Sequence, residues 1–164
     1  MKRNYTLSEY SSKIHKILSK VNNIALGSDL IVGFPGEGDE EFACTYDFLK
    51  SLPFSYLHIF PFSVRPDTEA FTMKQRVRGI DIKDRIQLLN EMNKEKKRLY
   101  LQRQVGRDLD IIVEEITADR HVKGTSGNYM KVSVPMENAK KGSIVFVRIL
   151  RAVDNHLDGA IINT

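Results

Sequence analysis

The hydrophobic pattern of the first residues is that of an amphipathic helix followed by a buried strand. Thr6 and Glu9 have the spacing of a capping box, the reciprocal pair of hydrogen bonds that starts a helix. The apolar residues behind them recur at helical spacing: Leu7, Tyr10, Ile14, Ile17, Leu18 and Val21. Asn22 and Asn23 end that helix. The run Leu30-Ile31-Val32 then lacks polar alternation, which predicts a strand covered on both faces in a parallel sheet.

A second helix and a second strand follow in the same order. Pro35 and Gly36 break the first strand, and the acidic run 39–41 lies where a helix N-terminus favours negative charge. Pro53 ends that helix, and Tyr56–Phe60 is predicted as another buried strand. This alternation indicates an α/β architecture with a parallel sheet. Because two strands alone make neither a closed barrel nor a stable open sheet, residues 1–80 are predicted to be part of something larger.

The pattern changes after residue 80. Helical spacing predicts a third helix over 81–104, with an apolar stripe that Lys96 interrupts. From residue 105 onward, short apolar runs are separated by Gly, Asn, Pro or Lys. The predicted strands are Asp110–Glu114, Val122–Gly124, Tyr129–Val134, Ser143–Ile149 and Gly159–Ile162. Such strands are typical of a small antiparallel barrel. The expected organisation is an α/β region over 1–80, a linking helix over 81–104 and an all-β domain over 105–164.

Composition narrows the class of protein. The hydrophobic share of 41% and the charged share of 28% are ordinary for a globular protein. No run of about 18 apolar residues is present, and polar residues follow the basic start, so neither a membrane span nor a secretory leader is expected and the predicted location is cytoplasmic. The net charge is +4, with most of the excess over 81–104. That stretch either attracts phosphate or is a solvated helix face.

The single cysteine, Cys44, excludes a disulfide framework and any cysteine-only metal or iron–sulfur site within one chain. It lies in the apolar series Phe42, Cys44, Tyr46 and Phe48, which predicts a buried, unreactive thiol. His58 is predicted to pack in a buried strand, because no His or Cys lies at metal-ligand spacing from it.

The segment Ile31-Val32-Gly33-Phe34-Pro35-Gly36-Glu37 is the most informative in the chain. Its glycines and proline follow the carboxyl end of a predicted parallel strand, where the loops of α/β folds converge on ligands. Glycine lets a backbone approach a ligand closely or take positive φ. Taken alone, the segment fits a ligand-binding loop and a plain strand-to-helix turn equally well.

Other segments give this one a context. Residues 1–6, Ser28–Glu37 and Leu57–Thr68 follow one another as in the radical SAM methylthiotransferases, which the chain resembles along nearly its whole length. Further on, Asn128–Val132 and Val145–Ile149 resemble the TRAM domain, the small RNA-binding barrel that ends these enzymes. The resemblance implies a partial TIM-like barrel fragment over residues 1–80, followed by a small all-β antiparallel TRAM barrel over 105–164.

The resemblance also implies an activity. Enzymes of this family are transferases that replace a carbon–hydrogen bond of a tRNA purine by a methylthio group. They use S-adenosylmethionine and two four-iron four-sulfur clusters, and the protein binds and orients these cofactors. The segment Leu52–Pro61 is most similar to the branch that acts on threonylcarbamoyladenosine beside the anticodon. The implied partner is therefore the anticodon region of tRNA.

Two departures from the family pattern limit what this chain is expected to do alone. The radical cluster needs three thiolates in a C-x-x-x-C-x-x-C loop, whereas Cys44 is alone and outside that motif. The chain is therefore expected to hold no cluster and to be inactive by itself. Met1 aligns inside the family pattern, which indicates truncation, by an interrupted reading frame or by excision from a longer protein. Asp67 stands where the family usually has glycine, so the loop is altered if that glycine takes positive φ.

The candidate site residues fall into two groups, and no catalytic or metal-ligating residue is assigned. The resemblance brings one group to S-adenosylmethionine: Asp29, Gly33, Phe34, Pro35, Gly36 and Glu37. For Asp29 and Glu37 the alternative is an ion pair or a helix cap. The RNA-binding candidates are Arg65, Tyr129, Lys131, Arg148 and Arg151, with Phe146 as a second stacking aromatic. For Arg65 the alternative is a structural pair with an acidic neighbour. Against the barrel candidates, residues 105–164 balance to zero charge, and the aromatics are alternatively core residues.

Three hypotheses remain open. The leading one is an inactive fragment of a tRNA methylthiotransferase, and the alternatives are a non-catalytic RNA-binding module acting through the barrel or a structural remnant without function. Copies of the chain are expected to associate through residues 1–80, because a part-barrel exposes strand edges and apolar helix faces.

Overall fold

The computed structural model describes residues 4–136 and 140–162. The chain divides into two compact units, Met1–Lys96 and Lys97–Thr164. Within the described ranges, no helix is both long and apolar enough to cross a membrane.

The first unit alternates helices and parallel strands, as the sequence predicts. Its elements are α1 (Leu7–Lys20), β1 (Gly27–Val32), α2 (Asp39–Ser51), β2 (Tyr56–Pro61), the short α3 (Glu69–Thr72) and α4 (Gly79–Gln102), whose last residues belong to the second unit. β1 and β2 pair in parallel, from Gly27 opposite Tyr56 to Val32 opposite Pro61. The α/β alternation and the parallel pairing are confirmed.

Local hydrogen bonds explain where the first two helices begin. The backbone N–H of Glu9 donates to Thr6 Oγ1 at 3.2 Å, and the Thr6 N–H donates to Glu9 Oε2 at 2.7 Å, so the predicted capping box is present. At the start of α2, the Gly38 N–H donates to Glu41 Oε2 at 2.9 Å. Asp39 and Glu40 add negative charge in the first turn, where the helix dipole stabilises it.

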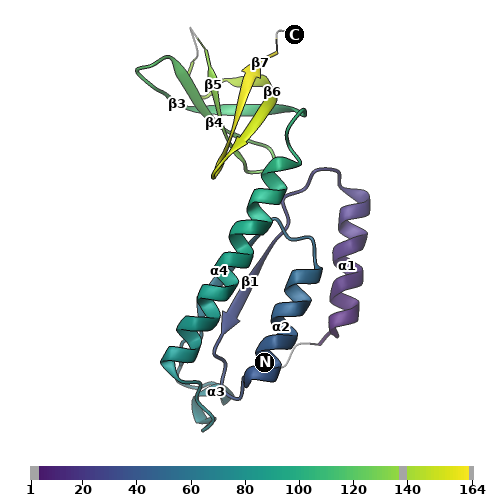
Figure 1. The fold of residues 1–164 in the computed structure, drawn as a ribbon, viewed down its shortest axis with the longest axis vertical. Coiled ribbons are helices and arrows are strands. Elements are labelled where there is room, and N and C mark those ends of the chain that lie inside the picture. The colour runs from purple at the N-terminus through teal and green to yellow at the C-terminus, as the bar shows by residue number, and fades with distance from the viewer. Residues whose placement is uncertain (1–3, 137–139, 163–164) are drawn as a thin grey trace. The chain divides into compact units, whose positions relative to one another are not determined.

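The core of the first unit lies between one face of the two strands and the helices α1, α2 and α4, which Figure 1 shows beside the sheet. Its buried members are Ile14, Val32, Leu49, Leu52, Phe54, Leu57, Leu89 and Met92. Successive strand residues point to opposite faces, so Val32 and Leu57 are buried while their neighbours Ile31 and His58 are exposed.

Two predictions about burial are wrong. The strands are covered on one face only, because Asp29, Ile31, His58 and Phe60 are all exposed. An unbroken apolar run shows that both faces are apolar, not that both are covered. Cys44 is exposed rather than buried. The apolar series around Cys44 repeats every two residues, which is the period of a strand. In the helix α2, residues two apart lie on nearly opposite sides, so this series does not place Cys44 in the core.

Polar side chains of α4 satisfy backbone groups of other elements. Asn93 Oδ1 accepts the Leu57 N–H at 2.7 Å and Asn93 Nδ2 donates to the Leu57 carbonyl at 2.8 Å, so this amide covers the edge of β2 at that point. Lys96 Nζ donates to the Leu52 carbonyl at 2.7 Å, just beyond the end of α2. Burial lowers the pKa of Lys96. The lysine that interrupts the apolar stripe therefore supports the C-terminus of α2.

The second unit contains a closed five-stranded barrel in the order β3-β4-β5-β7-β6. The strands are β3 (Asp108–Ile116), β4 (His121–Ser126), β5 (Lys131–Pro135), β6 (Ile144–Val153) and β7 (His156–Ile161). Inward residues alternate with outward ones, as in β6, where Val145, Val147 and Ile149 are buried. The predicted barrel is confirmed, but it is not wholly antiparallel: β5 and β7 close it in parallel, with Val132 opposite Leu157. Strand periodicity carries no information on pairing direction.

Candidate functional site

The loop after β1 is folded onto itself. The Gly33 N–H donates to both carboxylate oxygens of Glu37, at 3.1 and 3.2 Å, and the Glu37 N–H donates to the Phe34 carbonyl at 2.9 Å. The Gly36 N–H donates to the Gln75 carbonyl at 2.8 Å. Gly33 and Gly36 have φ of 82° and 87°, the left-handed region in which glycine has no steric cost. The turn therefore needs glycine at both positions.

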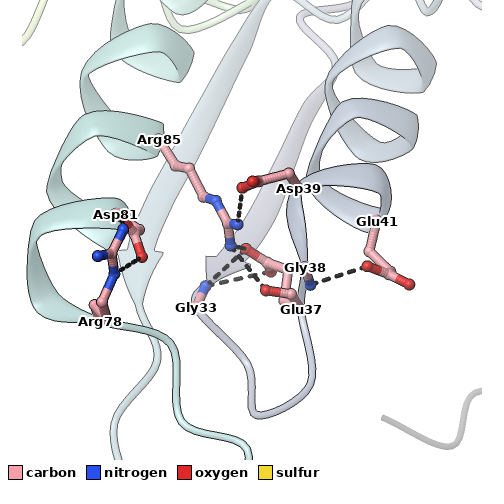
Figure 2. A network of polar contacts seen from close by, with 8 residues as sticks. All are labelled: Gly33, Glu37, Gly38, Asp39, Glu41, Arg78, Asp81 and Arg85. Atoms are coloured by element: carbon pink, nitrogen blue, oxygen red, sulfur yellow. Dashed lines mark hydrogen bonds and ion pairs between the residues drawn. The ribbon is translucent and has the colours of Figure 1, made fainter.

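Arg85 holds this loop from α4. Its guanidinium donates from Nη1 to Glu37 Oε1 at 2.8 Å and from Nη2 to Asp39 Oδ1 at 2.8 Å (Figure 2). A third bond reaches the Glu37 carbonyl at 3.0 Å, and the guanidinium lies 5.2 Å from the centre of the Phe42 ring. Only 8% of the Arg85 side chain and 16% of the Glu37 side chain are exposed.

The electrostatics of this pair are those of a structural ion pair. Burial of the guanidinium works to lower the pKa of Arg85, but the hydrogen bonds to Asp39 and Glu37 outweigh it and raise that pKa. The cation is therefore permanent, and it keeps the Glu37 carboxylate in place below the Gly33 amide. Glu37, predicted to contact a cofactor or to form an ion pair, forms the ion pair.

The same contacts limit what the loop can bind. Three of its four N–H groups, those of Gly33, Gly36 and Glu37, already have acceptors within the unit. A Cβ on Gly33 would lie 2.5 Å from the Ile82 side chain, so helix packing by itself requires glycine there. Pro35 is buried. The loop is a rigid frame at the end of β1 rather than a cradle of free amides for an anion.

The uncovered face of the sheet offers more to a ligand. Tyr56, His58 and Phe60 form a row along β2. The ring centroids of Tyr56 and His58 lie 5.1 Å apart in an edge-on arrangement, and those of His58 and Phe60 lie 6.4 Å apart with the rings tilted. On β1 the Tyr56 ring covers Gly27, where a Cβ would lie 2.2 Å from it. Asp29 lies directly opposite His58. This surface combines aromatic rings with one exposed carboxylate.

The remaining candidates of the first unit lie beyond these strands. Phe34 packs edge-on against Phe62 at 5.2 Å, which joins the two loops that follow β1 and β2. Arg65 is exposed in the second of these loops, and its carbonyl accepts a hydrogen bond from Thr68 at 2.8 Å. Asp67, two residues further on, has φ of 61°. The position of the expected glycine does take the left-handed conformation, and here an aspartate adopts it.

Donors for a metal or a cluster are few. The chain has one cysteine, and Cys44 lies on α2, away from the loops that follow the strands. Among the residues that the structure describes, no group of three or more His, Cys, Asp or Glu side chains is placed to hold a metal ion. A cysteine-ligated cluster needs more thiolates than this sequence contains.

The basic candidates of the barrel are already paired with carboxylates. Lys131 Nζ lies 2.7 Å from Glu114 Oε2, and Arg148 donates twice to Asp108, both times at 2.7 Å. Arg151 lies 2.7 Å from Asp158. A hydrogen bond from Arg148 lowers the pKa of Asp108, and one from Lys131 lowers that of Glu114. The structure thus distributes the predicted phosphate-binding cations over three separate ion pairs.

The aromatic candidates are on the surface. Tyr129 is 83% exposed and Phe146 is 50% exposed, so neither is a core residue. Phe146 lies on β6 opposite Asp110, whereas Tyr129 lies in the turn between β4 and β5. The predicted strand Tyr129–Val134 therefore starts two residues too early, since β5 begins at Lys131.

Sequence reasoning did not identify Arg85, Asn93 and Tyr56 as contributors to these sites. Arg85 has a detectable signal, because it lies three residues after Ile82 on the apolar face of the predicted helix. A charged residue on such a face requires a buried partner. Its partners, 46 and 48 residues away, are decided by the tertiary structure.

Comparison with known proteins adds relatives. The chain is 38% identical over 115 residues to the threonylcarbamoyladenosine tRNA methylthiotransferase of Aquifex aeolicus, covering 70% of this chain and 28% of that protein. It is 35% identical to the enzyme of the same name from Bacillus subtilis, covering 93% and 35%. It is 30% identical to the tRNA-2-methylthio-N(6)-dimethylallyladenosine synthase of Magnetococcus marinus, covering 99% and 38%. The chain thus spans about a third of the length of these relatives.

Other comparisons add little. No protein-family model matches the chain. One solved structure, of a multidomain protein with nucleic acid binding domains from Streptococcus pneumoniae, aligns over 38% of this chain and 24% of the solved chain. The sequence identity is 14% and the TM-score is 0.34. That likeness is too slight to bear on fold or function.

Proposed function

The chain belongs to the tRNA methylthiotransferase family, and from that premise we propose that it supplies one wall of the cofactor site and the RNA-binding barrel of such an enzyme. The single observation that carries the proposal is the relationship itself, at 35% identity over 93% of the chain. Residues 1–80 are then a fragment of a partial TIM-like barrel, 81–104 a linking helix, and 105–164 a TRAM domain that contacts the anticodon region of tRNA.

The proposed substrate is threonylcarbamoyladenosine in tRNA. Three relatives named for that nucleoside are 34–38% identical to the chain, whereas five named for dimethylallyladenosine are 30–33% identical. The segment Leu52–Pro61, which contains most of β2, resembles the same branch.

The uncovered face of β1 and β2 supports the cofactor wall. In a complete enzyme of this family, bound S-adenosylmethionine supplies the radical that removes hydrogen. The rings of Tyr56, His58 and Phe60 suit a flat base, and the Asp29 carboxylate suits a hydroxyl or a cationic group beside it. The Gly33–Glu37 loop, held by Arg85, fixes the end of β1, and three of its four N–H groups already have acceptors.

The residues present do not fit an iron–sulfur cluster, so no step through a cluster is derived for this chain. We propose that the chain alone is catalytically inactive. Anaerobic reconstitution with iron and sulfide then leaves it without four-iron absorbance. A stoichiometric cluster would refute the inactivity.

A chimera tests the proposed function directly. This chain replaces the matching segment of the Bacillus subtilis relative, and nucleoside mass spectrometry measures methylthiolated threonylcarbamoyladenosine in tRNA. We expect product, and an Asp29→Ala chimera with markedly less of it. A folded chimera that holds its clusters but forms no product, while the parent enzyme does, contradicts the proposal.

The alternative function is a non-catalytic RNA-binding module, and the closed barrel is the observation in its favour. Under this alternative, tRNA binds the isolated chain with salt-dependent affinity, and the chimera stays inactive. We also propose that copies of the isolated chain associate through the first unit, where one face of the sheet is uncovered.

A further inference from the structure

Tyr129 has the highest exposed fraction of the large apolar and aromatic side chains in the described part of the chain, 83%. It lies at the tip of the turn between β4 and β5, with φ of 61°. A bulky residue in the left-handed region is rare, because its Cβ crowds the backbone. The turn therefore bears a conformational cost that Tyr129 does not recover through burial. Such strained residues cluster at ligand-binding sites, where the surroundings hold them in place.

A buried polar network holds this turn. The Tyr129 N–H donates to the Ser126 carbonyl at 2.8 Å, and the Ser126 hydroxyl donates to Asn128 Oδ1 at 2.6 Å. Asn128 Nδ2 donates to the Tyr100 hydroxyl at 3.0 Å and to Gln104 Oε1 at 3.2 Å. Gln104 is 1% exposed and Ser126 is 3% exposed. These hydrogen bonds fix the backbone next to Tyr129, while its ring is exposed to solvent.

The other barrel candidates, Lys131, Arg148 and Arg151, each form an exposed ion pair with a carboxylate. An RNA duplex is recognised mostly through its phosphates and hydroxyls, whereas unpaired bases stack on aromatic rings. A pre-oriented, solvent-facing tyrosine fits the second mode better than the first.

We infer that Tyr129 is a stacking platform for one unpaired RNA base, and that Asn128 is the residue that positions it. This inference rests on the proposed RNA-binding function and specifies how the barrel recognises its substrate: by the exposed face of a base in a loop, not by a paired stem.

Replacement by tryptophan gives a direct probe, because the chain contains no other tryptophan. In Tyr129→Trp, a tRNA anticodon stem-loop should quench the emission on binding. A fully paired duplex of the same base composition should quench it much less. Equal quenching by both RNAs would overturn the inference.

Tyr129→Asn is the matched variant for affinity, because asparagine tolerates the left-handed conformation but has no ring. We expect stem-loop affinity to fall about 5- to 100-fold, the range for loss of one base stack. The salt dependence should be unchanged, because no phosphate contact is lost. The Tm should be equal to or above that of the parent chain, and Tyr129→Phe should bind as the parent does. A Tyr129→Asn chain that binds as tightly as the parent would refute the platform.

The positioning role of Asn128 is tested in the Tyr129→Trp background. Asn128→Ala should reduce the quenching amplitude, and in the Tyr129→Asn background it should cause no further loss of affinity, since coupled residues are not additive. Additive losses would contradict the role. If the parent chain binds no RNA at low salt, the proposed RNA-binding function itself fails; if it binds but tolerates Tyr129→Asn, only this inference fails.

Discussion

At the scale of single residues, the loop after β1 shows how one buried cation determines a local structure. Arg85 bonds the Glu37 carboxylate, that carboxylate bonds the Gly33 amide, and the chain turns within these few contacts. Asp39 also bonds Arg85, but its side chain is fully exposed, and water competes for that pair. The contribution of each partner to stability therefore follows its burial.

Replacing Arg85 by methionine should be strongly destabilising. The change leaves the Glu37 carboxylate largely buried without its cation, which costs about 3 kcal/mol in comparable pairs. Urea unfolding followed by near-ultraviolet circular dichroism measures the loss. Asp39→Ala is the matched control and should cost less than about 1 kcal/mol. Adding Glu37→Gln to Arg85→Met should recover part of the loss; no recovery would mean that the methionine, and not the stranded charge, causes it.

Asp67 permits a change in the opposite direction. Its φ of 61° strains an aspartate but not a glycine. Asp67→Gly should raise the free energy of unfolding by about 0.5 kcal/mol, because relief of strain slightly exceeds the added entropy of the unfolded chain. Asp67→Ala should lower it by about 1 kcal/mol. Thermal melts of the three chains rank them, and a glycine variant below the parent would show that the aspartate side chain stabilises this turn.

At the scale of elements, helix α4 completes the sheet. The Asn93 amide bonds both the N–H and the carbonyl of Leu57, so it takes the place of a neighbouring strand at the edge of β2. Lys96 does the same for the last carbonyls of α2. The apolar stripe of α4 is interrupted at Lys96, and these hydrogen bonds fix the position of α4 against β2 and the end of α2.

Asn93→Ala should therefore destabilise the first unit by about 2 kcal/mol, since two hydrogen bonds are lost and the backbone groups of Leu57 lose their partners. Asn90, exposed on the same helix, gives the control Asn90→Ala, which should change stability by less than about 0.5 kcal/mol. Chemical denaturation measures both variants. Equal effects would mean that helix propensity, not the strand edge, is responsible.

The capping box of α1 makes that helix sensitive to acid. The backbone and side-chain hydrogen bonds from Thr6 lower the pKa of Glu9 below its ordinary 4.5. Because the folded-state pKa is the lower one, its stabilisation is complete above about pH 4.5 and is lost as the pH falls through the folded value. Tm measured against pH should show a gap between the parent and Glu9→Gln at neutral pH that closes in acid. A gap independent of pH would exclude the carboxylate as its cause.

At the scale of the whole molecule, each unit has a core of its own, but only the barrel closes its sheet. The first unit leaves one sheet face in water, with Ile31 and Phe60 exposed on neighbouring strands. The Bacillus subtilis relative is about three times as long and has additional chain that could cover this face. In the isolated chain, we propose that a second copy covers it.

The association of isolated chains should then depend on this face. Phe60→Lys, which places a charge on the uncovered surface, should shift the mass measured by light scattering toward that of a monomer at high concentration. Leu88→Lys, an exposed position on α4, is the control and should leave the mass unchanged. A parent chain that is monomeric throughout would refute the association.

Much of the local structure was predictable because it depends on neighbours in the sequence. The capping box at Thr6, both strands and the long helix follow from residue type and spacing within one or two turns. Burial was less predictable: Cys44 and His58 were both assigned to the interior and both are exposed. An apolar neighbourhood in sequence does not reveal how many layers lie above a strand.

The sequence by itself determined the family, the order of the strands and of the three longer helices, and the glycines of the loop after β1, because those depend on short patterns and on backbone conformation. It did not predict the short helix α3. Tertiary structure alone decided that Glu37 pairs with Arg85, that the barrel cations are engaged by Asp108, Glu114 and Asp158, and that Tyr129 is held outward. These contacts join residues far apart in the chain, and their energies depend on distance and burial, which no local pattern contains.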